Sequence, residues 1–173
     1  FGLDIKWLRE FCDEFKKDGL HNKFSWCCAT RADVVTPEWA RVVAEAGCKW
    51  VWLGIESGDD YIRQVVYNKG IKKEDIIRGV SALKDNRINV GFYLMVGCPQ
   101  ESIKSAFSSV RLIFRTRPAA FHYMRYIPLP KTELSKSVQA KMWIRDKELR
   151  DYWNAPRLAT PHLGFNKMNI TVW

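Results

Sequence analysis

The sequence predicts an α/β protein with about four parallel strands and helices flanking them. Strand-like and helix-like segments alternate along the chain, which is the pattern of repeated βαβ units. One strand-like segment, residues 49–55, is a nearly continuous apolar run, as expected for a parallel strand covered on both faces. All four expected strands end in loops rich in polar, Gly or Pro residues. Because ligands bind at the carboxyl ends of parallel strands, we expect function to lie in these loops.

The first half of the chain begins with an amphipathic helix. In residues 3–17 apolar side chains recur every three to four positions, and an Asp-Gly pair follows as a stop. The short aromatic run 24–30 is expected to be a buried strand. A Thr-Pro pair then starts a helix at 37–46, because Thr is a good N-cap and Pro fits the first turn. The second strand, 49–55, follows directly.

The second half continues the alternation. Helices are expected at 59–67 and 73–85, followed by a third strand at 90–96. The next helix covers 102–115, where Pro118 ends it, and a fourth strand covers 120–127. Beyond this strand we expect helical turns through Trp143, then an irregular tail with a short helix at 145–153 and a strand-like end at 168–173.

Composition and length exclude several classes of protein. A chain of 173 residues buries one core, so a single domain is expected. No run of about eighteen apolar residues occurs, so we expect no membrane span. The N-terminus lacks a secretory signal, and an odd number of cysteines favours free thiols in the cytoplasm. All five are expected to be small buried side chains: Cys12, Cys27, Cys28, Cys48 and Cys98.

The formal net charge of +9 leaves a nucleic-acid partner as an alternative only. Lys and Arg are spread along the chain and not gathered in one run, so nucleic acid is not the expected partner. A basic, noncatalytic α/β nucleic-acid-binding module is the competing interpretation. An ordinary flavodoxin-like or TIM-type enzyme would predict a G-x-G-x-x-G phosphate loop, which the sequence lacks.

The second strand places a carboxylate at its end. Because residues two apart share a face of a strand, the sequence sorts them into two sets: Trp50, Trp52, Gly54 and Glu56, and Val51, Leu53 and Ile55. The aliphatic set suits packing against helices, which leaves Glu56 pointing inward above a glycine. A buried carboxylate needs a partner, and Arg31 or Lys69 could supply the opposite charge. The competing interpretation is a simple structural salt bridge.

Six short stretches, in this order, resemble the second half of the barrel of radical S-adenosylmethionine (SAM) enzymes. They are TRAD (30–33), AGC (46–48), LGIESGD (53–59), KGI (69–71), LMVGCPQE (94–101) and IPLPKT (127–132). The resemblance is strongest to the subgroup that often carries an upstream cobalamin-binding domain. Oxidative cyclases of the anaerobic bacteriochlorophyll pathway, which act on Mg-protoporphyrin monomethyl ester, belong to that subgroup.

The resemblance implies a partial (βα) TIM-type barrel of six strands. Residues 1–143 would supply strands three to six, and residues 144–173 would be a C-terminal extension of unknown role. A barrel without its first two strands has an open sheet edge, so we expect copies of the chain to associate through that edge.

The resemblance also implies an enzyme. Its members bind a [4Fe-4S] cluster through a C-x3-C-x2-C loop and cleave SAM reductively, and the resulting radical abstracts hydrogen from a small organic substrate. Cobalamin is a further candidate cofactor of the full-length protein. Because this chain contains no C-x3-C-x2-C motif, it is expected by itself to bind no cofactor and to be inactive. An RNA-modifying radical SAM enzyme is the alternative within the family.

By the same resemblance, seven residues would contact SAM. Glu56 and Ser57 would meet its ribose or methionine part, and Arg31 or Lys69 would hold its carboxylate. The loop that contains Gly97, Pro99 and Glu101 would run beside the adenine. Two positions depart from the pattern, since Gln100 and Lys131 stand where many relatives have Gly, which leaves the geometry of these turns open.

Overall fold

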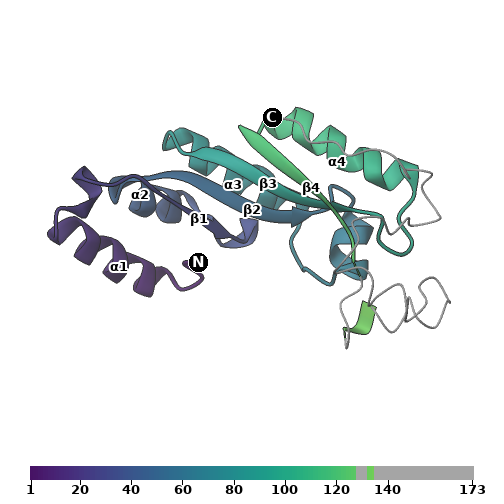
Figure 1. Cartoon of the computed structure of the whole chain (residues 1–173), viewed down its shortest axis with the longest axis horizontal. Helices are drawn as coiled ribbons and strands as arrows, with labels where there is room; N and C mark the ends of the chain where they lie inside the picture. Colours follow the sequence, from purple (N-terminus) through teal and green to yellow (C-terminus); the bar gives the residue numbers. More distant parts are fainter. Residues whose placement is uncertain (128–131, 135–173) are drawn as a thin grey trace, which may run out of the picture.

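The computed structural model describes residues 1–127 and 132–134, and its described part contains a four-stranded sheet with helices around it (Figure 1). The helices are α1 (Ile5–Lys17), α2 (Pro37–Glu45), α3 (Lys73–Asp85) and α4 (Ile103–Thr116). The strands are β1 (Trp26–Thr30), β2 (Cys48–Glu56), β3 (Asn89–Val96) and β4 (Ala120–Arg125). Neighbours in the order β1-β2-β3-β4 are all parallel, which confirms the predicted α/β fold.

Short polar side chains start α1 and α2, as the sequence predicted for α2. The Thr36 hydroxyl accepts a hydrogen bond from the backbone N–H of Trp39 at 3.1 Å, and Pro37 occupies the first turn. In α1 the carboxylate of Asp4 plays the same part, accepting from the N–H of Lys6 at 2.7 Å. These caps satisfy N–H groups that have no partner within the helix.

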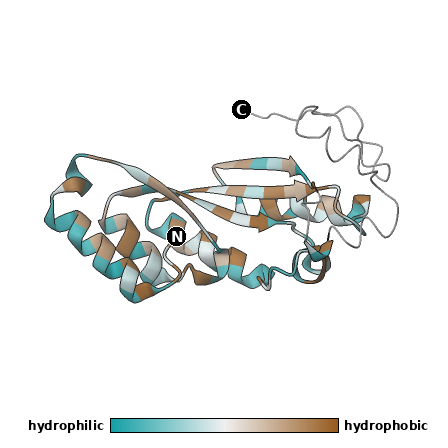
Figure 2. Cartoon of the chain, turned by 60° about the horizontal axis from the view of Figure 1, so that its bottom comes forward, coloured by the Kyte–Doolittle hydropathy of each residue, from teal (hydrophilic) through white to brown (hydrophobic). Residues whose placement is uncertain are grey.

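The two faces of β2 differ as predicted. Val51, Leu53 and Ile55 are fully buried and pack in the core with the β3 residues Val90 and Phe92. The other face carries half-buried side chains: Trp50, Trp52 and Glu56. Figure 2 shows many hydrophobic residues along the strands and a mixture of hydrophobic and hydrophilic residues on the helices. The helices therefore cover one face of the sheet with an aliphatic core, and the inner face of the barrel is the aromatic one.

The prediction for the cysteines is wrong at Cys27. Cys12, Cys48 and Cys98 are buried and Cys28 is half-buried, but Cys27 is exposed, and all five are free thiols. Alternation along β1 explains the difference, because Cys27 lies on the inner face while Cys28 faces the helices.

Element boundaries differ from the sequence prediction by one or two residues. The first strand begins at Trp26 instead of residue 24, and β4 ends at Arg125 instead of residue 127. Within the predicted helix 59–67, the turns over Ile62–Val66 are those of a π-helix. Such turns often occur near functional sites.

Several expectations fall outside the described residues. They are the helical turns through Trp143, the short helix at 145–153, the strand-like end at 168–173 and the domain boundary at residues 143 and 144. In the part of the chain that the structure describes, no helix is long and apolar enough to cross a membrane.

Candidate functional site

Glu56 and Lys69 form an ion pair at the carboxyl end of β2. Lys69 Nζ donates a hydrogen bond to Glu56 Oε1, and their side chains are only 20% and 16% exposed. The pair lies directly over Gly54, where an added β-carbon would stand 2.9 Å from Lys69 Nζ and 3.1 Å from Glu56 Oε1. The structure thus places Glu56 above Gly54, as predicted. Of the two partners that the sequence suggested, Lys69 is the one that pairs with it.

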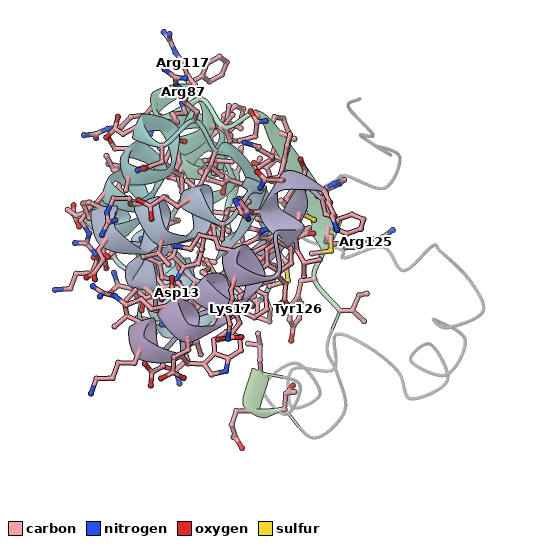
Figure 3. All side chains as sticks on the ribbon, turned by 90° about the vertical axis from the view of Figure 1, so that its left-hand side faces the viewer. Asp13, Lys17, Arg87, Arg117, Arg125 and Tyr126 are labelled. Atoms are coloured by element: carbon pink, nitrogen blue, oxygen red, sulfur yellow. The ribbon has the colours of Figure 1, made fainter. Side chains whose placement is uncertain are left out.

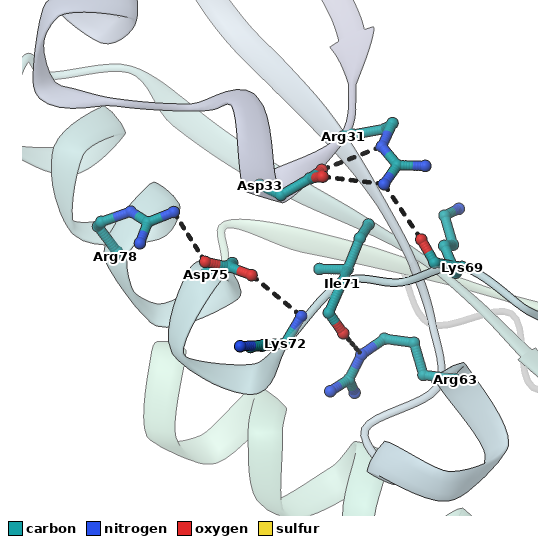
Figure 4. Close-up of polar contacts among 8 residues, drawn as sticks. All are labelled: Arg31, Asp33, Arg63, Lys69, Ile71, Lys72, Asp75 and Arg78. Carbon is teal, nitrogen blue, oxygen red and sulfur yellow. Dashed lines mark hydrogen bonds and ion pairs between the residues drawn. The ribbon is translucent and has the colours of Figure 1, made fainter. Parts of the chain in front are cut away.

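Arg31 is the predicted partner that does not reach Glu56. Its guanidinium makes two hydrogen bonds to Asp33, with Nε–Oδ1 at 3.0 Å and Nη2–Oδ2 at 2.9 Å. The same Nη2 donates to the carbonyl oxygen of Lys69 at 3.1 Å, as Figure 4 shows. The hydrogen bonds from Arg31 hold the pKa of the Asp33 carboxyl below its ordinary value. Arg31 therefore fixes the backbone that carries Lys69 and adds a second cation beside the pair.

The backbone at Glu56 is strained. Its φ is +65°, in the left-handed region, which residues other than glycine adopt only at a cost in conformational free energy. The register of β2 with β3 shifts at the same place, between Gly54 and Glu56. A strained residue at the end of a strand persists when the surrounding structure holds it, and such residues cluster at functional sites.

Ser57, the next predicted site residue, is fully buried. Its hydroxyl accepts a hydrogen bond from the N–H of Asp59 at 3.1 Å, and its carbonyl accepts one from Arg63 at 2.8 Å. Gly58 follows, with its N–H donating to Ser109 Oγ at 2.8 Å. A β-carbon on Gly58 would stand 2.4 Å from the carbonyl oxygen of Ser108, so this loop requires glycine to approach α4.

Arg63 organises the site and was missed by the sequence reasoning. Its side chain is fully buried, and its Nε donates to the carbonyl of Ile71 at 2.7 Å while its Nη1 donates to that of Ser57. A further contact joins it to the carboxylate of Asp60. Arg63 thus ties the loop after β2 to the segment that leads from Lys69 into α3 (Figure 4). The available signal was a single charged residue within the apolar run Ile62–Val66.

The loop after β3 holds the other predicted residues. Gly97 has a φ of +85°, and its N–H donates a hydrogen bond to Glu101 Oε2. Pro99, which lies between these two residues in the sequence, is buried. Glu101 is 8% exposed, and its Oε1 has no hydrogen-bond partner within residues 1–127 and 132–134. Burial raises the pKa of this carboxyl above its ordinary value. A buried oxygen without a partner is a group that a bound ligand could satisfy.

Gln100 keeps the turn geometry that glycine would favour. Its φ is +69°, and its side-chain oxygen accepts a hydrogen bond from the hydroxyl of Tyr61 at 2.6 Å. The predicted departure from the family pattern therefore changes the residue without removing the left-handed turn. The contact also joins the loop after β3 to the segment after β2.

Tyr67 lies between the two groups of site residues. Burial raises the pKa of its phenol, and the neighbouring Cys98, Glu101 and Glu56 raise it further. Its hydroxyl oxygen is buried without a hydrogen-bond partner in the described structure. The predicted residues therefore form two clusters, one at Glu56 and one at Glu101, with Tyr67 near both. In the described chain no group of three or more His, Cys, Asp or Glu is arranged to hold a metal ion.

The sequence matches one enzyme superfamily over most of the described residues. The profile of the radical SAM superfamily matches residues 4–113, which is well over half of the chain. The chain belongs to the radical SAM superfamily.

Similar proteins support this assignment and the partial barrel. An uncharacterized methyltransferase of Pyrococcus horikoshii, PH0819, is 24% identical over 134 residues, covering 78% of this chain and 28% of the relative. The radical SAM methyltransferase TsrM of Kitasatospora setae superposes with a TM-score of 0.66 at 19% identity, over 78% of this chain and 26% of that one. The cobalamin-dependent radical SAM enzyme OxsB superposes with a TM-score of 0.53 at 20% identity, over 84% and 20%.

These matches show how much of its relatives this chain covers. It spans between a fifth and about three tenths of the length of these three relatives. Its parallel sheet and flanking helices therefore correspond to a partial radical SAM barrel, as predicted, and enzymes associated with cobalamin are among the similar structures.

Proposed function

We propose that this chain forms the SAM-facing half of the barrel in a radical SAM enzyme that acts on a small organic substrate. The observation that carries the proposal is the Glu56–Lys69 pair, held over Gly54 at the carboxyl end of β2 and flanked by Arg31. Buried charges without a structural need are expensive, so a paired carboxylate and lysine at a strand end favour a binding site.

The chemistry of the side chains fits the cofactor. SAM carries a carboxylate and an ammonium, two ribose hydroxyls and an adenine. Lys69 and Arg31 are cations suited to the carboxylate, and the Glu56 carboxylate can accept hydrogen bonds from hydroxyls or the ammonium. The free Oε1 of Glu101 and the left-handed turn at Gly97 provide an acceptor and close backbone approach beside an adenine.

Each residue has a positioning role in this proposal. When bound, SAM and a [4Fe-4S] cluster would supply the radical chemistry. Glu56 and Lys69 orient the cofactor, and Arg31 fixes the backbone of Lys69. Arg63 and Gly58 hold the loop after β2 against α4, so that these groups keep their places when ligand enters. Cobalamin, the cytoplasmic location and self-association through the sheet edge remain predictions.

Binding measurements on the enzyme that contains this chain test the proposal. Glu56→Gln and Lys69→Met should each weaken binding of the unreactive analogue S-adenosylhomocysteine at least about tenfold, equal to about 1.4 kcal/mol. Glu74→Gln, an exposed carboxylate on α3, is the matched control and should bind normally. Undiminished binding by both site variants would overturn the assignment.

Two reaction types are candidates. The sequence resemblance predicts oxidative cyclisation, while the names of PH0819 and TsrM favour methyl transfer. Release of S-adenosylhomocysteine separates them, because methyl transfer produces it and oxidative cyclisation does not. Release of 5′-deoxyadenosine alone indicates hydrogen abstraction without methyl transfer, since a methyl transfer that uses hydrogen abstraction releases both products. Incubation with a tRNA pool as substrate tests the RNA-modifying alternative by the same products.

A further inference from the structure

Helix α4 turns its large apolar side chains toward the surface and its small polar side chains toward the sheet. Its buried face is made mainly of small polar residues: Ser105, Ser109, Leu112 and Thr116. Its exposed face carries large apolar side chains: Ile103 at 57% exposed, Phe107 at 56% and Phe114 at 75%. A surface helix of a soluble domain normally turns its apolar side to the core. Here the side facing the sheet approaches closely through Gly58 and Ser109, and the large apolar side faces outward.

These three exposed residues, together with the half-buried Val110, have the spacing of a helix-packing seam. Ile103, Phe107, Val110 and Phe114 follow one another at intervals of four, three and four residues. This is the alternation of a and d positions in a heptad repeat, with Phe107 and Phe114 at a. The helix is 14 residues long, so the seam covers two heptads.

The seam is flanked by positive charge only. Lys104 and Arg111 each follow a d residue and so occupy e positions, where charged residues choose the partner helix. Arg115 adds another exposed cation. The sequence of α4 contains no Asp or Glu, and no salt bridge in the described residues involves these three cations.

Each of the other helices carries carboxylates that pair with some of its own cations. Each has an ion pair along its own surface: Lys17 with Glu14 in α1, Arg41 with Glu45 in α2 and Arg78 with Asp75 in α3. Arg117, the residue directly after α4, is a further exposed cation, and Figure 3 shows its side chain and that of Arg87 projecting at one edge of the molecule. Among the four described helices, α4 is therefore the one without an ion pair on its own surface.

The charge of the chain argues against two occupants. A second copy carries a net charge of +9 and would repel this surface. The segment 135–173 of the same chain is also basic, with seven Lys and Arg against three Asp and Glu. The complement must be acidic and come from another molecule or domain.

We propose that the outer face of α4 docks an acidic amphipathic helix of a partner protein. The apolar seam would pack against a matching seam, and Glu or Asp beside that seam would pair with Lys104 and Arg111. A protein helix is favoured over nucleic acid because half of the seam, Ile103 and Val110, is aliphatic and offers no ring for base stacking. The surface lies at the end of the molecule opposite α1 (Figure 1).

Designed peptides test the proposal on the 173-residue chain. The probe is a fluorescent peptide of about three heptads with Leu along its seam and Glu beside it. Its binding, followed by anisotropy, should weaken at least about tenfold in the double variant Phe107→Ala and Phe114→Ala. Phe24→Ala is the matched control, because Phe24 is 60% exposed elsewhere on the surface, and it should bind normally.

Charge reversal makes the test independent of folding defects. Lys104→Glu with Arg111→Glu should lose the Glu peptide and gain a peptide in which Lys replaces Glu, whereas Lys6→Glu with Lys23→Glu should change neither. Failure of the chain to bind the Glu peptide, or equal binding by the Phe variants, would overturn the proposal. The proposal would also be overturned if single-stranded RNA or phosphatidylserine vesicles bound the chain in place of the Glu peptide and the same variants abolished that binding.

Discussion

A β-carbon on Gly91 would stand 2.3 Å from Cε3 of Trp52, because the indole of Trp52 lies across β3 at this glycine. The same indole has its ring centroid 4.8 Å from that of Tyr93 and 4.9 Å from that of His122. Gly91 thus lets residues of three neighbouring strands share one aromatic layer on the inner face of the sheet. A side chain at this position would have to displace the layer.

Gly91→Ala should therefore destabilise the fold by about 1–3 kcal/mol, the usual cost of overpacking. Urea unfolding measures this as a lower midpoint with an unchanged slope. Combining Gly91→Ala with Trp52→Leu should cost less than the two single changes added together, because the clash needs the indole. A Gly91→Ala variant as stable as the parent would show that the indole moves freely.

Two substitutions of Glu56 separate its charge from its backbone strain. Both Glu56→Ala and Glu56→Gly leave the Lys69 ammonium without its partner, but only glycine relieves the left-handed φ of +65°. Glu56→Gly should therefore be more stable than Glu56→Ala by about 1 kcal/mol. Thermal unfolding of the two variants side by side gives the difference, and the opposite order would contradict the strain argument.

Arg63→Met should cost about 3–5 kcal/mol, because it leaves the buried carbonyls of Ser57 and Ile71 without their donor. The loss should be concentrated between these residues. Hydrogen exchange should speed up at the backbone amides of 57–71 more than in β3. Gln64→Ala, at the exposed neighbouring position, is the control. Uniform acceleration across the whole sheet would mean that Arg63 supports global stability and not this loop in particular.

The parts of the site that follow from periodicity could be predicted, and those that follow from loop packing could not. Alternation along β2 placed Glu56 on the inner face above Gly54, and a charge requirement pointed to Arg31 or Lys69, of which Lys69 is the partner. Arg63 lies in a π-helical segment, and Tyr67 directly follows it. A pattern based on 3.6 residues per turn does not predict where the side chains of a π-helix point. The contacts of Arg63 and Tyr67 are to backbone carbonyls and to residues distant in sequence, which side-chain patterns do not encode.

The same limit explains Cys27. A short strand with apolar residues on both faces gives no alternation from which to tell the helix-covered face from the inner one. Only the pairing of β1 with β2 shows which side Cys27 takes.

Thiol labelling should follow this geometry. At pH 8 a disulfide reagent should modify Cys27 in a fast phase, because it is the exposed cysteine. Burial raises the pKa values of Cys12 and Cys98 to about 11, so these thiols should react slowly. Cys27→Ser should remove the fast phase, and Cys12→Ser should leave it intact. A fast phase that survives Cys27→Ser would place the exposed thiol elsewhere.

Stability should depend on pH through Glu101. Burial raises the pKa of its carboxyl in the folded chain, while the unfolded chain titrates near the ordinary value of 4.5. Between these two pKa values the folded state holds a proton that the unfolded state lacks, so the free energy of unfolding falls as pH rises, by at most about 1.4 kcal/mol per pH unit. The substitution Glu101→Gln removes this titration.

The free energy of unfolding of Glu101→Gln relative to the parent should therefore increase from pH 4 upward and level off above the raised pKa. Glu74→Gln, whose side chain is exposed, should give a flat difference over the same range. A Glu101→Gln difference that shrinks with rising pH would mean that hydrogen bonding to the carboxylate, such as that from the Gly97 N–H, outweighs its burial.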